Sequence, residues 1–314
     1  METLSKAYIA ELPNYYSGKV RENYFLDNGI RITIATDRLS AFDRNIACVP
    51  HKGQILNQMT KYWFKNTSDI CKNYAIDYPD PNVLVGEQLK MIPIELIVRG
   101  YLSGNTNTSI LTLYKKGDRI IYGHRLPDGM SKNQKLPQPI ITPTTKSAKN
   151  DHDLPISAHE IIQQGILTKK QWDIISNYSL SLFNRGCKIA ADSGLILADS
   201  KYEFGLNKSN EIILADEIHT PDSSRYWTIE GYKQSIIDGI MPSGLDKDII
   251  RNWILKRCYP YKDKIPKIPN ELILDVSKAY ITAYEKITKS KFIFNNNDCS
   301  ILQRIRNNLC KYYV

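Results

Sequence analysis

Long apolar runs are absent from this sequence. No stretch approaches the roughly eighteen consecutive apolar residues that a helix needs to cross a bilayer. The first residues, METLSKAYIAELP, contain no apolar segment of signal-peptide length. We therefore expect a soluble protein without a membrane-spanning helix.

Cysteines are few and lie far apart. The six of them form no CxxC pair and match no zinc-ligand spacing. Scattered single cysteines are typical of proteins that are kept reduced inside the cell. We expect mostly buried, reduced thiols and a cytoplasmic protein.

Concentrated positive charge is also missing, although positive charge is in excess. The formal net charge is +9 and the isoelectric point is about 9.0. No cluster of Lys and Arg is longer than a few residues, and the 20 tyrosines are dispersed. A nucleic-acid-binding surface of clustered cations and interleaved aromatics is therefore not indicated. The surplus suits phosphorylated small molecules, which it can attract electrostatically.

Length and local patterns predict the organisation of the chain. The 314 residues suit two domains, or one domain with a sizeable appendage. Turn signals at Asp27-Asn28-Gly29 predict a hairpin of residues 15–26 and 30–35, and an apolar run predicts a buried strand at 91–98. Residues 127–155 lack periodicity and predict a long loop. Periodicity and capping patterns predict helices at 54–65, after Ser157, from Thr168 to Gly194, and at about 249–257, 271–287 and 300–312.

The most informative stretch is residues 195–227. An apolar strand at 195–198 ends on Asp199, and two further strand-like runs, 201–206 and 211–218, flank a polar turn. The expected pairing places Lys201 opposite Asp216, with Glu203 diagonal to Asp216 on the same face. The opposite face carries Tyr202, Phe204 and Leu206, which we expect in the core.

Charged residues on this strand face have two explanations. They commonly form the solvated face of an antiparallel pair. Two carboxylates beside a lysine, followed by a loop with hydroxyls and Arg225, also suit a site for Mg²⁺ and phosphate. Spacing alone leaves both explanations open. Arg99, just past the strand at 91–98, suits either a phosphate or a nearby carboxylate.

The N-terminal hairpin carries a weaker signal. Gly18-Lys19 at the start of a strand could let a backbone and an ammonium approach a phosphate, but the GxxxxGK[ST] pattern of a Walker loop is absent. Taken alone, a Gly-Lys pair is more often part of a turn. Residues 36–43, ending on Asp43, are dense in polar groups at a strand end, where functional sites often lie.

Six motifs in order resemble the blocks of the SAICAR synthetase family. They are GKVRENY (18–24), ATDRLSAFD (35–43), LIVRGYLSG (96–104), QKLPQPIITPTTK (134–146), ADSKYEFG (198–205) and DEIHTPDSSRYW (216–227). The resemblance covers about residues 18–257, and the chain length is similar to the longer, yeast-like form of the family. The last motif is highly specific.

The resemblance implies a fold, a reaction and its cofactors. It implies an α+β, ATP-grasp-like fold of antiparallel sheets with packed helices, in which the nucleotide binds in a cleft between subdomains. It implies a ligase of purine biosynthesis that joins carboxyaminoimidazole ribonucleotide (CAIR) to L-aspartate with ATP and Mg²⁺. We expect an ATP-covering domain at 1–98, a substrate- and Mg²⁺-binding domain at 99–235 and a helical region at 236–314. We also expect a monomer or small homo-oligomer that binds no nucleic acid and no membrane.

The resemblance also implies roles for individual residues. Lys201 would sit by the reacting carboxylate and Asp43 near the imidazole, as catalytic residues. Glu203 and Asp216 would hold Mg²⁺. The ATP phosphates would contact Gly18, Lys19 and Arg21, and the ribonucleotide would contact Arg99, Ser103, Lys146, Ser223, Ser224 and Arg225.

The chain departs from the family pattern at three positions. Glu22 stands where Asp is more common, Asn105 replaces a serine of the phosphate-binding SGS motif, and His219 replaces an aliphatic residue. We expect His219 to be a polar surface residue without a role. Two other enzyme classes would share parts of this pattern: a different ATP-dependent ligase acting on a phosphorylated carboxylate, and a phosphotransferase that needs no aspartate.

Overall fold

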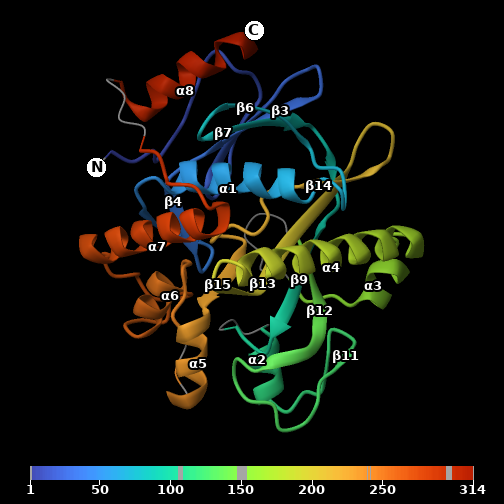
Figure 1. Ribbon diagram of the computed structural model, residues 1–314. Helices are drawn as coiled ribbons and strands as arrows, with labels where there is room; N and C mark the ends of the chain where they lie inside the picture. The colour runs from blue at the N-terminus through green and yellow to red at the C-terminus, as the bar shows by residue number, and fades with distance from the viewer. Residues whose placement is uncertain are drawn as a thin grey trace.

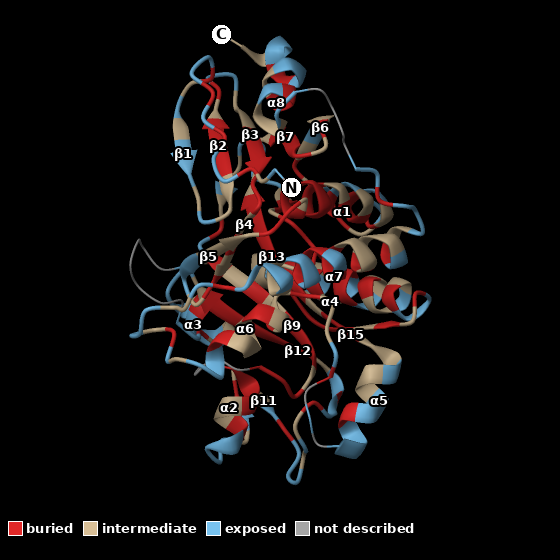
Figure 2. Ribbon diagram, turned by 90° about the vertical axis from the view of Figure 1, so that its left-hand side faces the viewer, coloured by how far each residue is buried: buried red, intermediate tan, exposed pale blue. Residues whose placement is uncertain are grey.

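The computed structural model describes residues 2–104, 109–146, 154–238, 240, 242–294 and 299–313. Within these ranges, none of the helices has the length and apolar character required to cross a bilayer. Antiparallel sheets and packed helices make up an α+β fold, as predicted (Figure 1). The buried residues run along the strands and the inner sides of the helices through the middle of the molecule (Figure 2).

The N-terminal sheet has five antiparallel strands. The predicted hairpin is confirmed, with Gly29 in the left-handed region (φ 82°) at its turn. Its first strand is interrupted at residues 18–20, so two strands stand where one was predicted. The order across the sheet is β1 (Tyr15–Ser17), β2 (Arg21–Phe25), β3 (Ile30–Ala35), β7 (Val83–Glu87) and β6 (Ala75–Asp80).

The C-terminal helix covers this sheet. Helix α8 (Ile301–Leu309), followed by the 3-10 turn η1 (Cys310–Tyr312), lies beside the sheet (Figure 1). Its Ile305 and Leu309 join the sheet's apolar core. Arg304 forms a buried ion pair with Asp80 of β6, 2.9 Å from Nε to Oδ2. The C-terminal helix and the N-terminal sheet therefore share one apolar core.

The second sheet is built around one long strand, β13 (Leu195–Leu206). The prediction that a strand ends at Asp199 is wrong, because β13 continues through this residue. Pairing with β9 and β15 holds it there, with a bulge between Leu197 and Asp199. The strands that pair with β13 are β8 (Lys90–Met91), β9 (Ile94–Tyr101), β14 (Ile212–Ala215) and β15 (Ser224–Thr228), and β12 (Lys135–Thr145) pairs with the outer side of β9.

Strand β12 corrects the prediction of a long loop at 127–155. It carries prolines, which donate no backbone hydrogen bond and weaken any sequence-based strand prediction. β12 lies at the edge of its sheet and pairs with β9, and Thr144 near its end also bridges to Pro155. A strand at the edge of a sheet can hold prolines. Residues 147–153 of the predicted loop lie outside the described residues, as does Asn105.

The predicted register between β13 and β14 is wrong by one residue. Glu203 pairs with Ala215, so Lys201 is not in line with Asp216. The cause is the turn, in which Asn210 adopts a left-handed conformation (φ 59°). Asp216, just past the end of β14, is also left-handed (φ 59°), and its side chain comes within 3.5 Å of Lys201. Lys201 and Asp216 therefore come close together, although they are not paired across the two strands.

The helices pack around the second sheet. Both predicted capping boxes are confirmed, at Ser157 and Thr168. The long helix from Thr168 packs on β13, and the helix at 52–66 lies beside the helix at 270–288 (Figure 1). The helices already predicted are α1 (Lys52–Asn66), α3 (Ala158–Gln163), α4 (Lys169–Ala191), α6 (Asp248–Leu255) and α7 (Asn270–Thr288).

Several short elements were not predicted. They are two helices and two small hairpins, in which a few residues of regular structure leave little periodicity to detect. One of these helices, with the neighbouring hairpin, forms an arm with its own small apolar core. The elements are β4 (Arg38–Ala41), β5 (Arg44–Cys48), α2 (Ile110–Lys115), β10 (Ile120–Ile121), β11 (His124–Arg125) and α5 (Ile229–Asp238). Strands β6, β7 and β15 were not predicted either. The prediction that Ser224 and Arg225 lie in a loop is wrong, because both belong to β15, which pairs with β13.

Candidate active site

A cavity of about 270 Å³ lies where β9, β13 and β15 meet the start of α6. It is polar on most sides and collects charged side chains from segments far apart in the sequence. The sites predicted at Arg99, Lys201, Ser223, Ser224 and Arg225 all line it. Residues that line it and were not predicted include Glu95, Asp199, Asp222, Lys247, Asp248 and Arg251.

Two arginines, the buried Arg99 and the half-buried Arg225, share one carboxylate in this cavity. Asp199 Oδ2 lies 3.2 Å from Arg99 Nη1 and 3.0 Å from Arg225 Nη1. Arg225 Nη1 also donates to Ser103 Oγ at 2.9 Å, and Arg99 Nε donates to Thr142 Oγ1 at 2.9 Å. The ion pair that the sequence left open for Arg99 therefore exists. It does not remove Arg99 from the cavity, which the guanidinium still lines.

The arginines carry more positive charge than the ionised carboxylates beside them. Burial and the neighbouring Asp248 raise the pKa of Asp246, which lines the same cavity, to about 8, so this carboxyl is protonated at neutral pH. Burial works to lower the pKa of Arg225, but Asp199 and Asp248 outweigh burial and raise it. Burial lowers the pKa of Arg99, and Asp199 offsets this only in part. Arg251 adds a third guanidinium, 3.2 Å from Asp248 Oδ1. The cluster therefore suits an anion that supplies further negative charge.

Asp222 holds the loop that precedes β15 in place. Its Oδ2 lies 2.6 Å from Nζ of the buried Lys52, and its Oδ1 accepts from Tyr280 at 2.7 Å. Lys247 Nζ donates to the Asp222 carbonyl at 2.9 Å. Burial works to raise the pKa of Asp222, but Lys52 and Lys247 lower it to about 2. The carboxylate therefore stays ionised and ties the loop to α1 and α7.

Lys201 is the centre of a second cluster. Its Nζ lies 3.0 Å from Glu95 Oε1 and 3.5 Å from Asp216 Oδ2, and it contacts Glu203. Lys146 contacts the other oxygen of Glu203. Burial works to lower the pKa of Lys201, but Glu203 and Glu95 raise it well above its ordinary value. Lys201 is therefore a fixed ammonium and not a base.

Glu203 is held as a carboxylate by the same contacts. Burial works to raise its pKa, but Lys201 and Lys146 hold the pKa of Glu203 well below its ordinary range. The described residues contain no group of three or more His, Cys, Asp or Glu arranged to hold a metal ion. The donor chemistry of Glu203 and Asp216 nevertheless suits Mg²⁺, which binds proteins through one or two carboxylates and takes its other ligands from phosphates and water.

Arg21 connects the N-terminal sheet to this cluster. From β2 it contacts Asp216, and its Nη2 lies 2.5 Å from Glu217 Oε1. The predicted ATP-binding residue and the predicted metal ligand therefore touch. Gly18 donates its N–H to the Arg21 carbonyl at 2.8 Å, which closes the turn that precedes β2.

Lys19 and Asp43 lie apart from the cavity lining. Lys19 Nζ pairs with Asp43 Oδ1 at 2.6 Å, and both side chains are more than half exposed. The structure thus brings these two predicted residues together but does not bring them into contact with Lys201 or Arg225. Their pairing joins the turn before β2 to the β4–β5 hairpin.

Signals for the missed residues were present in the sequence. Glu95 is a lone carboxylate inside an otherwise apolar strand, where an unpaired charge is costly. Asp246-Lys247-Asp248 places three charges at the start of a predicted helix, and Arg251 follows Asp248 at a spacing of one helical turn. Asp199 ends an apolar run. Only the fold reveals that they share one cavity.

The expectation that His219 is a surface residue is wrong. His219 is fully buried, and its Nε2 lies 2.6 Å from the hydroxyl of Tyr202. Its ring packs edge-on against Trp63, with the ring centroids 4.5 Å apart. Burial lowers the pKa of His219 to about 3, so the imidazole is neutral. The loop that carries His219 turns inward, and the neighbouring Ile218 and Thr220 are fully buried with it.

Known proteins match both the sequence and this geometry. A family model described as SAICAR synthetase matches residues 14–268. The phosphoribosylaminoimidazole-succinocarboxamide synthase of Legionella pneumophila (strain Paris) is 48% identical over 298 residues, which cover 95% of each chain.

Solved structures of the same family share the fold. The SAICAR-synthase from Saccharomyces cerevisiae complexed with SAICAR superposes with a TM-score of 0.79 at 30% identity, covering 93% of this chain and 100% of that one. A SAICAR synthetase (Type-2) in complex with ADP superposes with a TM-score of 0.68 at 26% identity, covering 90% and 100%. The resemblance of the six motifs is thereby confirmed over most of the chain. The chain belongs to the SAICAR synthetase family, the phosphoribosylaminoimidazole-succinocarboxamide synthases.

Proposed function

We propose that the chain carries out its family's ligation through an acyl phosphate, with the two charge clusters dividing the work. The reaction joins the carboxylate of CAIR to the amine of L-aspartate and consumes ATP. An amine cannot displace oxide from a carboxylate at a useful rate, so the carboxylate must first be activated. Transfer of the γ-phosphoryl group of ATP to this carboxylate gives the acyl phosphate and ADP. Attack by the aspartate amine then releases phosphate and forms the amide.

The arginine pair on Asp199 is the observation that supports this proposal most strongly. Arg99 and Arg225 lie on neighbours of β13 and meet at one carboxylate oxygen of Asp199. With Arg251, three guanidiniums face the two carboxylates of Asp199 and Asp248, so positive charge is in excess. A ribonucleotide phosphate would supply the missing negative charge through charge-assisted hydrogen bonds. Ser103, Ser223 and Ser224 lie around the same arginines or line the cavity and add hydroxyl donors.

Lys201 and its carboxylates would serve the reacting end. Because Lys201 remains protonated, it would neutralise negative charge that develops on the transferring phosphoryl group rather than remove a proton. Glu203 and Asp216 would hold Mg²⁺, which supplies charge neutralisation to ATP phosphates. Binding of Mg²⁺ to Glu203 would displace one of the lysines that contact this carboxylate. Lys146 is the more easily displaced of the two, because its side chain is 39% exposed.

The N-terminal turn would cover the ATP phosphates. Gly18, Lys19 and Arg21 belong to one turn, and Arg21 already reaches the proposed metal ligand Asp216. Lys19, exposed and paired with Asp43, is free of the core and able to exchange that partner for a phosphate. Asp43 would then face the imidazole of CAIR. Phosphoryl transfer depends mainly on such positioning and charge neutralisation.

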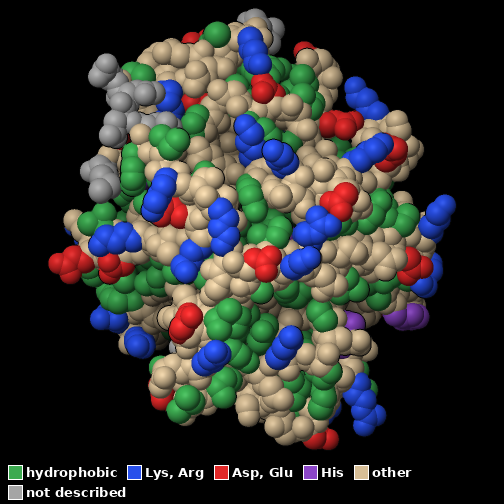
Figure 3. All heavy atoms as spheres, viewed as in Figure 1, with side chains coloured by type: hydrophobic (Ala, Val, Ile, Leu, Met, Phe, Trp, Pro, Cys, Tyr) green, Lys and Arg blue, Asp and Glu red, His purple; other side chains and the backbone are tan. Residues whose placement is uncertain are grey.

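We also propose that the domain boundaries lie at residues 98 and 235. Strand β9 crosses the first boundary, so the ATP-covering and substrate-binding parts would share a continuous strand. We propose a cytoplasmic monomer or small homo-oligomer that acts on small molecules. The cysteines of the described residues are all free, which suits a reducing compartment. Lys and Arg are scattered over the face seen in Figure 3 and form no continuous band.

An oxygen-labelling experiment tests the acyl phosphate. CAIR labelled with heavy oxygen in its carboxylate is incubated with the chain, L-aspartate and Mg²⁺·ATP, and the products are analysed by mass spectrometry. One label should appear in the released phosphate, because the bridging oxygen leaves with it. Label that stays wholly out of the phosphate would refute the mechanism. Full ATP turnover without L-aspartate would instead indicate a phosphotransferase, and succinate in place of aspartate should give no amide.

A further inference from the structure

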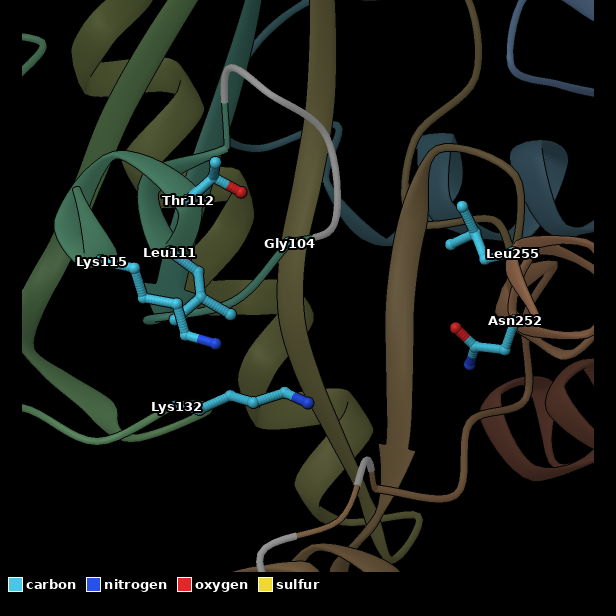
Figure 4. A pocket seen from close by; sticks show the side chains of 7 residues that line it. All are labelled: Gly104, Leu111, Thr112, Lys115, Lys132, Asn252 and Leu255. Carbon is cyan, nitrogen blue, oxygen red and sulfur yellow. The ribbon is translucent and has the colours of Figure 1, made fainter. Parts of the chain in front are cut away.

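A second cavity of about 340 Å³ lies beside the first, between the arm formed by α2 and the helix α6. Leu111, Thr112 and Lys115 of α2 line one side with Lys132. In Figure 4 the ammonium ends of Lys115 and Lys132 are directed toward the same space, and Asn252 and Leu255 lie across from them. The lining thus offers cations, polar groups and a small apolar surface.

The two lysines of this cavity have no counter-charge. Within the described ranges, neither the exposed side chain of Lys115 nor the side chain of Lys132 forms an ion pair or a hydrogen bond. Lys132 is half-buried, and burial together with the charge of Lys115 lowers its pKa. Like charges that share a cavity repel each other, which is a cost that a bound anion removes. Elsewhere on α2's arm, by contrast, Arg119 is paired with Asp128.

The second cavity is a direct neighbour of the proposed ribonucleotide cavity. Gly104 lines both. A side chain is not tolerated at this position, since φ is 121° and an added Cβ would lie 2.4 Å from the Cβ of Ser109. Helix α6 contributes to both cavities as well, with Arg251 on one side and Asn252 on the other. An anion held by the lysines would therefore lie next to the arginine cluster without occupying it.

We propose that Lys115 and Lys132 form a second phosphate-binding site, separate from the arginine cluster. Two lysine ammoniums act as point charges with freely turning donors, which suits a tetrahedral phosphate dianion. Thr112 and Asn252 provide further hydrogen-bonding groups. The ligand is a phosphate group, either as free inorganic phosphate or as the phosphate end of a nucleotide. This site would concentrate phosphorylated ligands beside the ribonucleotide cavity.

The proposal is tested by NMR signals from the lysine side chains of the full chain. Reductive ¹³C-methylation keeps the charge of each lysine and gives each a separate NMR signal, assigned with the variants Lys115→Gln, Lys132→Gln and Lys116→Gln. Lys116 is the matched control, because it is exposed on the same helix end and does not line the cavity. Inorganic phosphate, AMP and sodium chloride of equal ionic strength are titrated separately.

We expect phosphate to move the Lys115 and Lys132 signals together, with one dissociation constant, and to leave Lys116 in place. In Lys115→Gln the dissociation constant reported by Lys132 should rise about tenfold, whereas Lys116→Gln should change it less than about twofold. If AMP binds as well, the ligand includes the phosphate end of nucleotides; if only inorganic phosphate binds, it is the free anion.

The site would be overturned by signals that do not move, by an equal response to chloride, or by equal effects of Lys115→Gln and Lys116→Gln. Binding of AMP but not of phosphate would also overturn it, because the nucleoside would then carry the recognition. The measurement needs no turnover, so it is independent of the proposed function. A chain that makes SAICAR but shows no lysine response refutes only this site.

Discussion

Asp199 should stabilise the folded protein because its carboxylate lies between the like charges of the buried Arg99 and the half-buried Arg225. The carboxylate is 7% exposed, and it contacts Arg99 at 3.2 Å and Arg225 at 3.0 Å. Asp199→Asn preserves the shape but leaves both guanidiniums without this charge. Breaking a buried ion pair by removing one partner costs about 3–5 kcal/mol. We expect a loss near the lower end, about 3 kcal/mol, because Arg225 keeps its contact with Asp248.

Urea unfolding measures this loss, provided that the slope with urea is unchanged between the variant and the parent. Asp173→Asn is the control: it removes a carboxylate from an exposed pair with Lys169, 2.5 Å apart on α4. An exposed pair of this kind contributes less than about 0.5 kcal/mol. The contrast between the two variants isolates the effect of burial.

A bound ribonucleotide should reverse the defect. Its phosphate brings negative charge to the two arginines, and the variant no longer has a carboxylate that repels it. Saturating ribonucleotide should therefore raise the free energy of unfolding more in Asp199→Asn than in the parent chain. Equal stability of the two chains without ligand would refute the buried-pair reasoning. Equal stabilisation by the ligand would show that the phosphate binds away from Asp199.

Three further outcomes are expected. Because burial lowers the pKa of His219 to about 3, the folded state binds fewer protons than the unfolded state below pH 6.5, so stability is full above that pH and falls by about 2 kcal/mol at pH 5. The free energy of unfolding of His219→Gln, measured by denaturation between pH 6.5 and pH 5, should lack this part of the pH dependence. Glu203→Gln and Asp216→Asn should keep the circular dichroism of the parent and lose roughly 100-fold in ADP formation. Normal turnover at low Mg²⁺ would mean that these carboxylates serve only as ion-pair partners of Lys201 and do not hold the metal. Arg225→Ala should weaken ribonucleotide binding by about 1.5–3 kcal/mol in calorimetry, with partial recovery in Arg225→Lys, and unchanged affinity would remove Arg225 from the site.

Elements whose interactions are local could be predicted from the sequence. The capping boxes at Ser157 and Thr168 join side chains and backbone groups three residues apart, so the pattern contains all the atoms involved. The turn at Asp27-Asn28-Gly29 depends on the left-handed conformation of one glycine. The helices after residue 248 follow from periodicity alone. The family followed from motifs whose order is itself a property of the sequence.

Features that depend on a neighbouring strand could not be predicted in this way. The prolines of β12 indicate a loop until the strand is seen to lie at an edge, paired with β9. The register of β13 and β14 changes by one residue because Asn210 turns left-handed, and Asp216 restores the contact with Lys201 by doing the same. His219 is buried by packing on Trp63, which is distant in the sequence.

The site depends on both levels. Residue types alone indicated that Arg99, Arg225 and the carboxylates near Lys201 suit phosphate and Mg²⁺. Their joint position was decided by the tertiary structure, because Arg99 on β9 and Arg225 on β15 meet only where both strands pair with β13 at Asp199. Electrostatic interactions depend on distance and burial, and both are set by contacts between residues about a hundred positions apart in the chain.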